Sequence, residues 1–177
     1  MNIEAQVEAL KAAIRDVPDF PKPGVVFKDI TTLLRDPVLF RRSIDLLVAA
    51  CGDRPVDKVV AIESRGFLFG GAVAHQLGAG FVPVRKPGKL PCRTVEASYE
   101  LEYGTDTVEM HEDALTAGDR VLIVDDVIAT GGTARAAGVL TERLGATVSA
   151  FVFLVELSFL AGREKLAGHD IVSLIRY

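Results

Sequence analysis

The chain has 177 residues, of which 49% are hydrophobic and 25% are charged, and its formal net charge at pH 7 is −4. These values exclude a disordered chain and predict one globular domain that buries enough apolar surface to fold without disulfides or metal. The negative charge disfavours a nucleic-acid-binding protein, and no segment has the roughly 20 apolar residues of a membrane span.

Cysteine usage and the first residues indicate a cellular compartment. The two cysteines, Cys51 and Cys92, lie in no CxxC pair and in no Cys/His cluster with zinc spacing, which favours a reduced protein. The N-terminal stretch mixes acidic and apolar residues and lacks the apolar run of a signal peptide. We therefore expect a cytoplasmic protein that contacts neither membrane nor nucleic acid.

The first third of the chain reads as helix, loop and helix. Apolar residues at helical spacing from Ile3 to Ile14 predict a first helix. The stretch DVPDFPKPGVVF at 16–27 has three prolines and predicts an extended loop. Asp36 followed by Pro37 is a helix start, with a capping side chain and then proline in the first turn, and this helix should reach about Ala50.

The remainder alternates apolar strands with helices. The strands are expected at 58–62, 81–84, 121–124, 147–155 and 171–175, and the helices at 67–77, from the turn after 124 to about 144, and at 163–166. This alternation predicts an α/β fold with a central parallel sheet of about five strands, flanked by helices on both faces.

One region, between Arg85 and Arg120, interrupts the alternation. It opens with the basic, proline-bearing stretch RKPGKLPCRT, and the following residues alternate like a hairpin that turns at 103–105. Long insertions between parallel strands are usually functional. We therefore expect an inserted lid, made of a flexible loop and a β-hairpin, at 85–110.

The stretch VLIVDDVIATGGTARAAGVL, which starts at Val121, predicts a ligand site. Its buried strand ends in Asp125 and Asp126, two like charges that repel and therefore need hydrogen-bond donors or a cation. The small residues that follow allow a close approach of backbone N–H groups to an anion at a helix start; they are Ala129, Thr130, Gly131, Gly132 and Thr133. We expect the aspartates to hold two sugar hydroxyls and the loop to bind a 5-phosphate.

Other nucleotide-binding motifs do not fit this stretch. A Walker B strand also ends in an acid, but its partner GxxxxGK[ST] is absent from the sequence, and so is the dinucleotide fingerprint GxGxxG. A plain solvated turn with a capping threonine is the remaining structural alternative.

Arg65, in the stretch ESRGFLFG, marks a second turn between a buried strand and a helix. A guanidinium at such a turn suits diphosphate oxygens, which it can bind through two parallel hydrogen bonds. The alternative is a structural ion pair with Glu63 or another acid.

Six stretches together resemble a known family. VLIVDDVIATGGTA resembles the signature with which type I phosphoribosyltransferases bind 5-phosphoribosyl-1-diphosphate (PRPP). FPKPGVVFKDIT, ESRGFLFG, VRKPGKLP, SYELEYG and VELSFLAGREKL narrow the resemblance to the adenine-using members. The resemblance implies one domain over 1–177, with an N-terminal helix and base-binding hood segment at 1–35. It also implies purine salvage from adenine and PRPP to AMP and diphosphate, Mg²⁺ held mainly by PRPP and water, and a homodimer.

The resemblance also implies roles for particular residues. It places Arg65, Arg85, Lys86 and Lys89 at the diphosphate, and it implies a cis peptide bond between Glu63 and Ser64. It assigns adenine binding to Val25 and Phe27, catalysis to Glu102, and a covering role over the site to Tyr103.

Alternatives remain at the base end of the site. Strand alternation puts Glu100 and Glu102 on one face, so residue chemistry alone does not separate them. A hypoxanthine, xanthine or orotate enzyme on the same fold is the second hypothesis. A regulator that keeps the PRPP site as a sensor is the third, although the residues before the first expected sheet strand show no clear helix-turn-helix.

Overall fold

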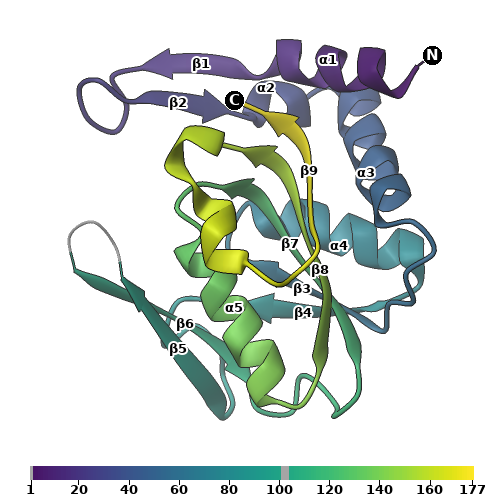
Figure 1. The fold of residues 1–177 in the computed structure, drawn as a ribbon, viewed down its shortest axis with the longest axis vertical. Coiled ribbons are helices and arrows are strands. Elements are labelled where there is room, and N and C mark those ends of the chain that lie inside the picture. The colour runs from purple at the N-terminus through teal and green to yellow at the C-terminus, as the bar shows by residue number, and fades with distance from the viewer. Residues whose placement is uncertain (1, 101–103) are drawn as a thin grey trace. The chain divides into compact units, whose positions relative to one another are not determined.

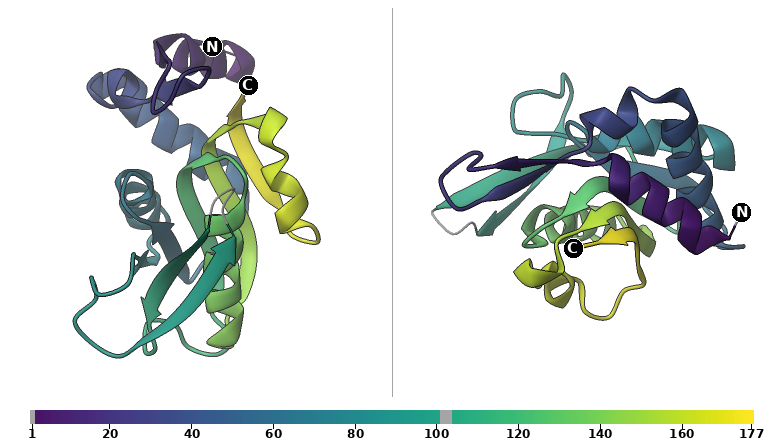
Figure 2. Two further views of the ribbon diagram at one scale, coloured as in Figure 1. Left: turned by 90° about the vertical axis from the view of Figure 1, so that its left-hand side faces the viewer. Right: turned by 90° about the horizontal axis from the view of Figure 1, so that it is seen from above.

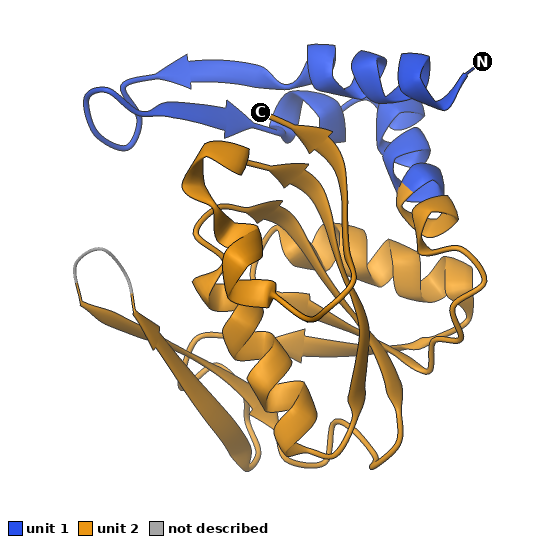
Figure 3. Ribbon diagram, in the orientation of Figure 1, with its two compact units in different colours: residues 1–46 blue, residues 47–177 orange. Residues whose placement is uncertain are grey.

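The computed structural model describes residues 2–100 and 104–177. They form two compact units, Met1–Leu46 and Leu47–Tyr177, and the boundary falls inside helix α3 (Pro37–Cys51) (Figure 3). The expected single domain over 1–177 therefore stays a prediction, and each unit is described by itself. Over the described residues, no helix has the length and apolar character needed to cross a bilayer.

The first unit begins with helix α1 (Ile3–Ala13), which is capped by Asn2: the Asn2 side chain accepts a hydrogen bond from the Glu4 amide. The expected loop at 16–27 is wrong in part, because strands β1 (Arg15–Pro18) and β2 (Val26–Asp29) pair there in antiparallel fashion. Lys28 Nζ lies 2.6 Å from Asp16 Oδ1 across the pair. Of the three prolines, one ends β1 and two lie in the connection, where no ladder hydrogen bond is lost.

Two further helices follow in this unit. The short helix α2 (Thr31–Leu34) was not expected from the sequence. The helix start at Asp36 is confirmed, because its carboxylate accepts hydrogen bonds from the amides of Val38 and Leu39 at 2.9 and 3.0 Å.

The second unit is built on a parallel sheet of five strands, as the sequence predicts (Figure 1). The strands are β3 (Lys58–Ile62), β4 (Gly80–Val84), β7 (Arg120–Ile128), β8 (Thr147–Glu156) and β9 (Ile171–Arg176), in the spatial order β4-β3-β7-β8-β9. The chain moves outward from β3 to β4 and then returns to β7 on the other side of β3. This reversal makes the β3–β7 boundary the topological switch point, where open α/β sheets bind ligands.

Helices α4 (Gly66–Leu77) and α5 (Gly132–Arg143) cover opposite faces of this sheet (Figure 2). Right-handed crossovers that run in opposite directions along a sheet require this arrangement. The short 3₁₀ helices η1 (Ser158–Leu160) and η2 (Gly162–Leu166) follow β8. Fully buried Phe151 and Phe153 on β8 and Leu140 on α5 belong to the main core.

The expected hairpin is confirmed as strands β5 (Thr94–Glu100) and β6 (Thr105–His111), which pair in antiparallel fashion. Residues 101–103, which connect them, lie outside the described residues. Ala97, Val108 and Met110 of the hairpin are buried in the main core. The base of the hairpin is therefore anchored by apolar packing beside α5.

Candidate active site

The carboxyl ends of β3 and β7 bring Arg65 and Asp126 together at the switch point. Arg65 precedes α4, and its Nε lies 2.6 Å from Asp126 Oδ2. The alternative ion pair for Arg65 is thus realised, with Asp126 in place of Glu63. The side chain of Asp126 is only 7% exposed, whereas that of Arg65 is 41% exposed. The arginine therefore offsets the charge of Asp126 and still faces solvent.

Asp125 and Asp126 lie within strand β7, although the sequence placed them just beyond its end. The strand continues to Ile128 because β8 keeps pairing with it, up to the partners Ile128 and Glu156. Asp125 Oδ1 accepts a hydrogen bond of 2.9 Å from the Asp126 amide. Burial and the neighbouring charge of Asp126 raise the pKa of Asp125 well above its ordinary value of 3.8, against a smaller opposing effect of Arg65.

The loop after β7 forms a small hollow at the start of α5. A cavity of about 90 Å³ is lined by Asp125 and by residues 127–134, which run from the end of β7 through the loop into the first turn of α5. These residues include all five expected at the phosphate, Ala129, Thr130, Gly131, Gly132 and Thr133. Gly131 has a φ of +77°, a conformation that favours glycine, and it caps the helix. Successive amides of the first turn are thus available to an anion.

Two glycines beside this hollow bring other segments close to it: Gly66, which was not singled out from the sequence, and Gly132, which was expected at the phosphate. A Cβ on Gly66 would lie 2.6 Å from Asp125 Oδ1, and a Cβ on Gly132 would lie 2.7 Å from the ring of Tyr99. Both positions therefore exclude larger side chains. The first glycine lets α4 approach the aspartate pair, and the second seats the hairpin on the start of α5.

In the basic loop, residues 85–94, the three cations expected at the diphosphate are divided between two acids. Glu63 Oε2 lies 2.8 Å from Arg85 Nε, and Glu63 Oε1 lies 3.1 Å from Lys89 Nζ. Burial opposes ionisation of Glu63, but the hydrogen bonds from these two cations outweigh it and lower its pKa. Lys86 instead pairs with Asp106 on the hairpin and lies 3.3 Å from the Tyr99 hydroxyl. The expected cis peptide bond between Glu63 and Ser64 is confirmed.

Glu109, which the sequence did not mark, organises the main chain of the basic loop. The residue is 3% exposed, and its Oε1 accepts hydrogen bonds of 3.0 Å from the amides of Lys89 and Leu90. Its Oε2 accepts from the Thr94 hydroxyl at 3.2 Å. Burial raises the pKa of Glu109, but these donors more than compensate and leave it below its usual value. Alternation alone gives no signal that separates this acid from its neighbours.

The residues expected at the base end belong to the first unit or lie outside the described residues. Val25 and Phe27 belong to the first unit, where Phe27 packs edge-on against Phe20 with ring centroids 5.2 Å apart. The catalytic candidate Glu102 and the covering candidate Tyr103 lie outside the described residues. Their roles stay predictions.

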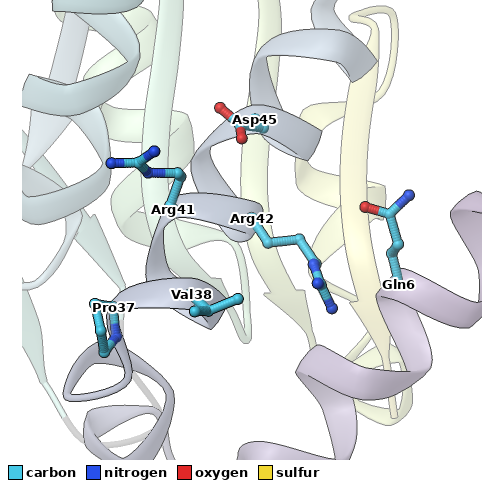
Figure 4. Close-up of a pocket in the computed structure, with 6 residues that line it drawn as sticks. All are labelled: Gln6, Pro37, Val38, Arg41, Arg42 and Asp45. Carbon is cyan, nitrogen blue, oxygen red and sulfur yellow. The ribbon is translucent and has the colours of Figure 1, made fainter. Parts of the chain in front are cut away.

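A larger hollow of about 470 Å³ in the first unit contains none of the expected site residues. It lies between α1 and α3 and is lined by Gln6, Pro37, Val38, Arg41, Arg42 and Asp45. Figure 4 shows Arg42 extending toward Gln6, whereas Arg41 points away from it. Because the two guanidinium groups diverge, they do not form a common anion site.

Known proteins share this sequence and this fold. The family described as phosphoribosyl transferase domain matches residues 30–171. The adenine phosphoribosyltransferase of Thermoanaerobacter sp. strain X514 is 55% identical over 171 residues, which cover 97% of this chain and 99% of that protein. That of Solibacter usitatus is 58% identical over 168 residues, covering 95% and 97%.

Solved structures agree with this assignment. The crystal structure of the adenine phosphoribosyltransferase from Thermoanaerobacter pseudethanolicus matches with a TM-score of 0.95 and 55% identity, over 97% of this chain and 99% of that chain. The Saccharomyces cerevisiae enzyme, complexed with D-2,5-dideoxy-2,5-imino-altritol 1,6-bisphosphate and adenine, matches with a TM-score of 0.91 and 45% identity, over 97% and 99%. The chain therefore belongs to the phosphoribosyltransferase family, in its adenine phosphoribosyltransferase branch.

Proposed function

We propose that this chain transfers the 5-phosphoribosyl group of PRPP to adenine, forming AMP and diphosphate in purine salvage. The observation that carries the proposal is the placement of an aspartate pair, Asp126 buried and Asp125 half-buried, beside an amide-lined hollow at the switch point. The relatives at 55–58% identity that carry the name adenine phosphoribosyltransferase support it, as does the yeast structure complexed with adenine.

The hollow and the aspartate pair suit the two ends of a ribose 5-phosphate. The amides around Gly131 would bind the phosphate, and Asp125 and Asp126 would accept hydrogen bonds from the two ribose hydroxyls. A hydroxyl donor would relieve the repulsion that raises the pKa of Asp125. Binding of the ribose hydroxyls would therefore stabilise the two neighbouring carboxylates in their charged form.

The cations near the end of β3 suit the diphosphate. Arg65 offers a partly exposed guanidinium. Arg85 and Lys89 both pair with Glu63, which lies two residues before Arg65 in the sequence. Lys86 reaches the same ligand only if its pair with Asp106 opens. Diphosphate leaves as positive charge develops on the sugar ring, and fixed cations stabilise the departing charge without reorganising.

At the base end, adenine N9 attacks the ribose C1 as the bond to diphosphate breaks, and N9 loses its proton. We propose Glu102 as the carboxylate that accepts this proton or stabilises the charged purine. Val25 and Phe27 would provide apolar contacts to the adenine ring, with backbone groups selecting the 6-amino group. Tyr103 would cover the site and exclude water, which could otherwise hydrolyse PRPP.

Magnesium is proposed as the metal that accompanies PRPP. Over residues 2–100 and 104–177, no three His, Cys, Asp or Glu side chains gather closely enough to hold a metal ion. The donor set fits a metal held mainly by the substrate and water, with Asp125 and Asp126 holding the hydroxyls beside it. When bound, such an ion would neutralise charge on the diphosphate.

A homodimer and a cytoplasmic location complete the proposal. Both rest on the resemblance in sequence, and the location is also supported by the two cysteines, which are unpaired, Cys51 buried and Cys92 exposed.

The test is release of diphosphate from PRPP and Mg²⁺ when adenine, hypoxanthine, guanine or orotate is offered separately. We expect adenine to support turnover and the 6-oxo bases to support little. A preference for hypoxanthine would favour the second enzymatic hypothesis. PRPP binding by calorimetry without turnover on any base would favour the sensor.

A further inference from the structure

The stretch VELSFLAGREKL resembles the family but has no role in the proposed mechanism so far. In the structure its glycine, Gly162, lies directly against residues 129–133, the segment proposed to bind the 5-phosphate and called the phosphate loop below. A Cβ on Gly131 would lie 2.3 Å from the Gly162 carbonyl oxygen. A Cβ on Gly162 would lie 2.2 Å from the Ala129 carbonyl oxygen and 3.0 Å from the Gly131 amide nitrogen. The two backbones are therefore in contact, and neither position admits a side chain.

The segment that presents Gly162 is itself held in place. Ala161, just before it, has a φ of +52°, in the left-handed region that non-glycine residues rarely adopt. Leu166, at the end of η2, is fully buried in the core. The amide of Glu164 donates to the Ala161 carbonyl at 3.0 Å. Both sides of the glycine are thus fixed by local structure.

A partly buried ion pair ties this segment to the strand beside the loop. Arg163 Nε lies 2.9 and 3.1 Å from the two carboxylate oxygens of Glu156, which is 7% exposed, and Arg176 approaches the same carboxylate at 3.4 Å. Glu156 ends β8 opposite Ile128, the residue from which the phosphate loop departs. The Leu157 amide also donates to the Ile128 carbonyl at 3.0 Å.

We propose that Gly162 is a positioning residue for the 5-phosphate end of PRPP, held in place by the Arg163–Glu156 pair. It acts through the loop, because its backbone forms the surface against which Ala129 and Gly131 rest. Amides bind a phosphate well only when their directions are fixed before the ligand arrives. This role rests on the proposed function and adds the device that keeps the phosphate loop in shape.

The test compares Gly162→Ala with Gly71→Ala, whose added Cβ would meet no heavy atom within 4 Å. Steady-state kinetics would give kcat and the KM values for PRPP and adenine. Ribose 5-phosphate and diphosphate would be used as separate inhibitors competing with PRPP. For Gly162→Ala we expect the KM for PRPP and the inhibition constant of ribose 5-phosphate to rise about tenfold or more, because small misplacements of binding groups are costly.

The contrast between the two inhibitors separates positioning from general damage. The inhibition constant of diphosphate and the KM for adenine should stay within about twofold of wild type, as should all constants of Gly71→Ala. Equal weakening of both inhibitors would overturn the proposal, since the whole site would then be disturbed. Unchanged inhibition by ribose 5-phosphate would overturn it as well.

A second variant keeps the test decisive if Gly162→Ala fails to fold. Arg163→Lys keeps the charge but loses the guanidinium that spans both oxygens of Glu156. We expect the same selective loss of ribose 5-phosphate inhibition, at a smaller size. If the wild-type enzyme formed no AMP, calorimetry with ribose 5-phosphate would still compare these variants. A selective loss there would uphold the positioning role while the proposed function failed.

Discussion

Arg65 joins the two strands at the switch point, with its Nε 2.6 Å from Asp126 Oδ2. Among the described residues, that oxygen accepts no well-aligned hydrogen bond, so the contact is an ion pair without ideal hydrogen-bond geometry. A nearly buried carboxylate in this state can gain a donor at little cost. The pair therefore links the ends of β3 and β7 while this buried carboxylate oxygen keeps unused acceptor capacity.

The half-buried position of Asp125 beside the like charge of Asp126 predicts that Asp125→Asn stabilises the free protein while it weakens PRPP binding. Its pKa in the fold lies above the ordinary value of 3.8 because of burial and Asp126. The fold therefore favours the protonated form, and this contribution is fully present below about pH 3.8 and is lost as pH rises through the folded pKa. Removing the charge should raise the free energy of unfolding at pH 7 by on the order of 1 kcal/mol.

Urea unfolding from pH 4 to 8 would measure this effect, with PRPP affinity taken from calorimetry. Asp53→Asn, at an exposed position, is the control and should change neither quantity. A less stable Asp125→Asn protein at neutral pH would contradict the argued repulsion. Unchanged PRPP affinity would remove Asp125 from the hydroxyl-binding role.

The buried acceptor Glu109 predicts a second effect, on the basic loop. Glu109→Gln keeps the shape of the side chain, but its amide group would confront the donors of Lys89, Leu90 and Thr94. A lost charge-assisted network of this kind costs about 1.5–3 kcal/mol. The loop should loosen, so we expect a several-fold higher KM for PRPP and faster tryptic cleavage after Lys89.

Peptide mapping of tryptic digests with and without PRPP would follow the loop directly. Glu112→Gln is the matched control, because that carboxylate is 45% exposed and lies 4.0 Å from Arg93. Cleavage after Lys89 at the wild-type rate in Glu109→Gln would show that the loop does not depend on this acid.

The sequence predicted the sheet well because strand and helix periods are local. The strand at 58–62 was placed at its observed bounds, and the cap at Asp36 was identified from two residues. The antiparallel pair at 15–29 was missed, since its cross-strand charges become partners only when the chain folds back. The end of β7 was placed too early because polar residues such as Asp125 usually end a buried strand, and here pairing with β8 continues.

The sequence predicted the residues that line the hollow after β7 but not the residues that support them. The aspartate pair and the small-residue loop have signatures within a few adjacent positions. Gly66, Glu109 and Gly162 act through contacts with segments tens of residues away, and nothing in their own neighbourhood marks them. The division of Lys86 and Lys89 between two acids likewise depends on the fold.

The catalytic role proposed for Glu102 predicts a third outcome, a contrast between Glu102 and Glu100. Glu102→Gln should keep PRPP affinity and lose most of kcat, because an amide cannot accept the N9 proton; general base groups contribute roughly 10²–10⁴-fold. Glu100→Gln, at the exposed end of β5, should behave like wild type. Calorimetry and stopped-time assays of AMP formation measure the two quantities. Near-normal kcat in Glu102→Gln, or a loss in Glu100→Gln instead, would reassign the role.

Two adjacent glycines of α4 provide a last prediction, about how tightly this helix packs on the sheet. A Cβ on Gly70 would lie 2.4 Å from the Ala61 Cβ on β3, whereas a Cβ on Gly71 would meet nothing within 4 Å. Gly70→Ala should therefore destabilise the protein by about 1–3 kcal/mol through overpacking. Gly71→Ala should be neutral or stabilising by up to about 1 kcal/mol, because alanine favours the helix. Thermal and urea unfolding would measure both. Equal effects at the two positions would mean that α4 can move away from β3 without loss of stability. The position of Arg65, just before the first residue of α4, would then depend on its ion pair with Asp126 and not on the packing of the helix.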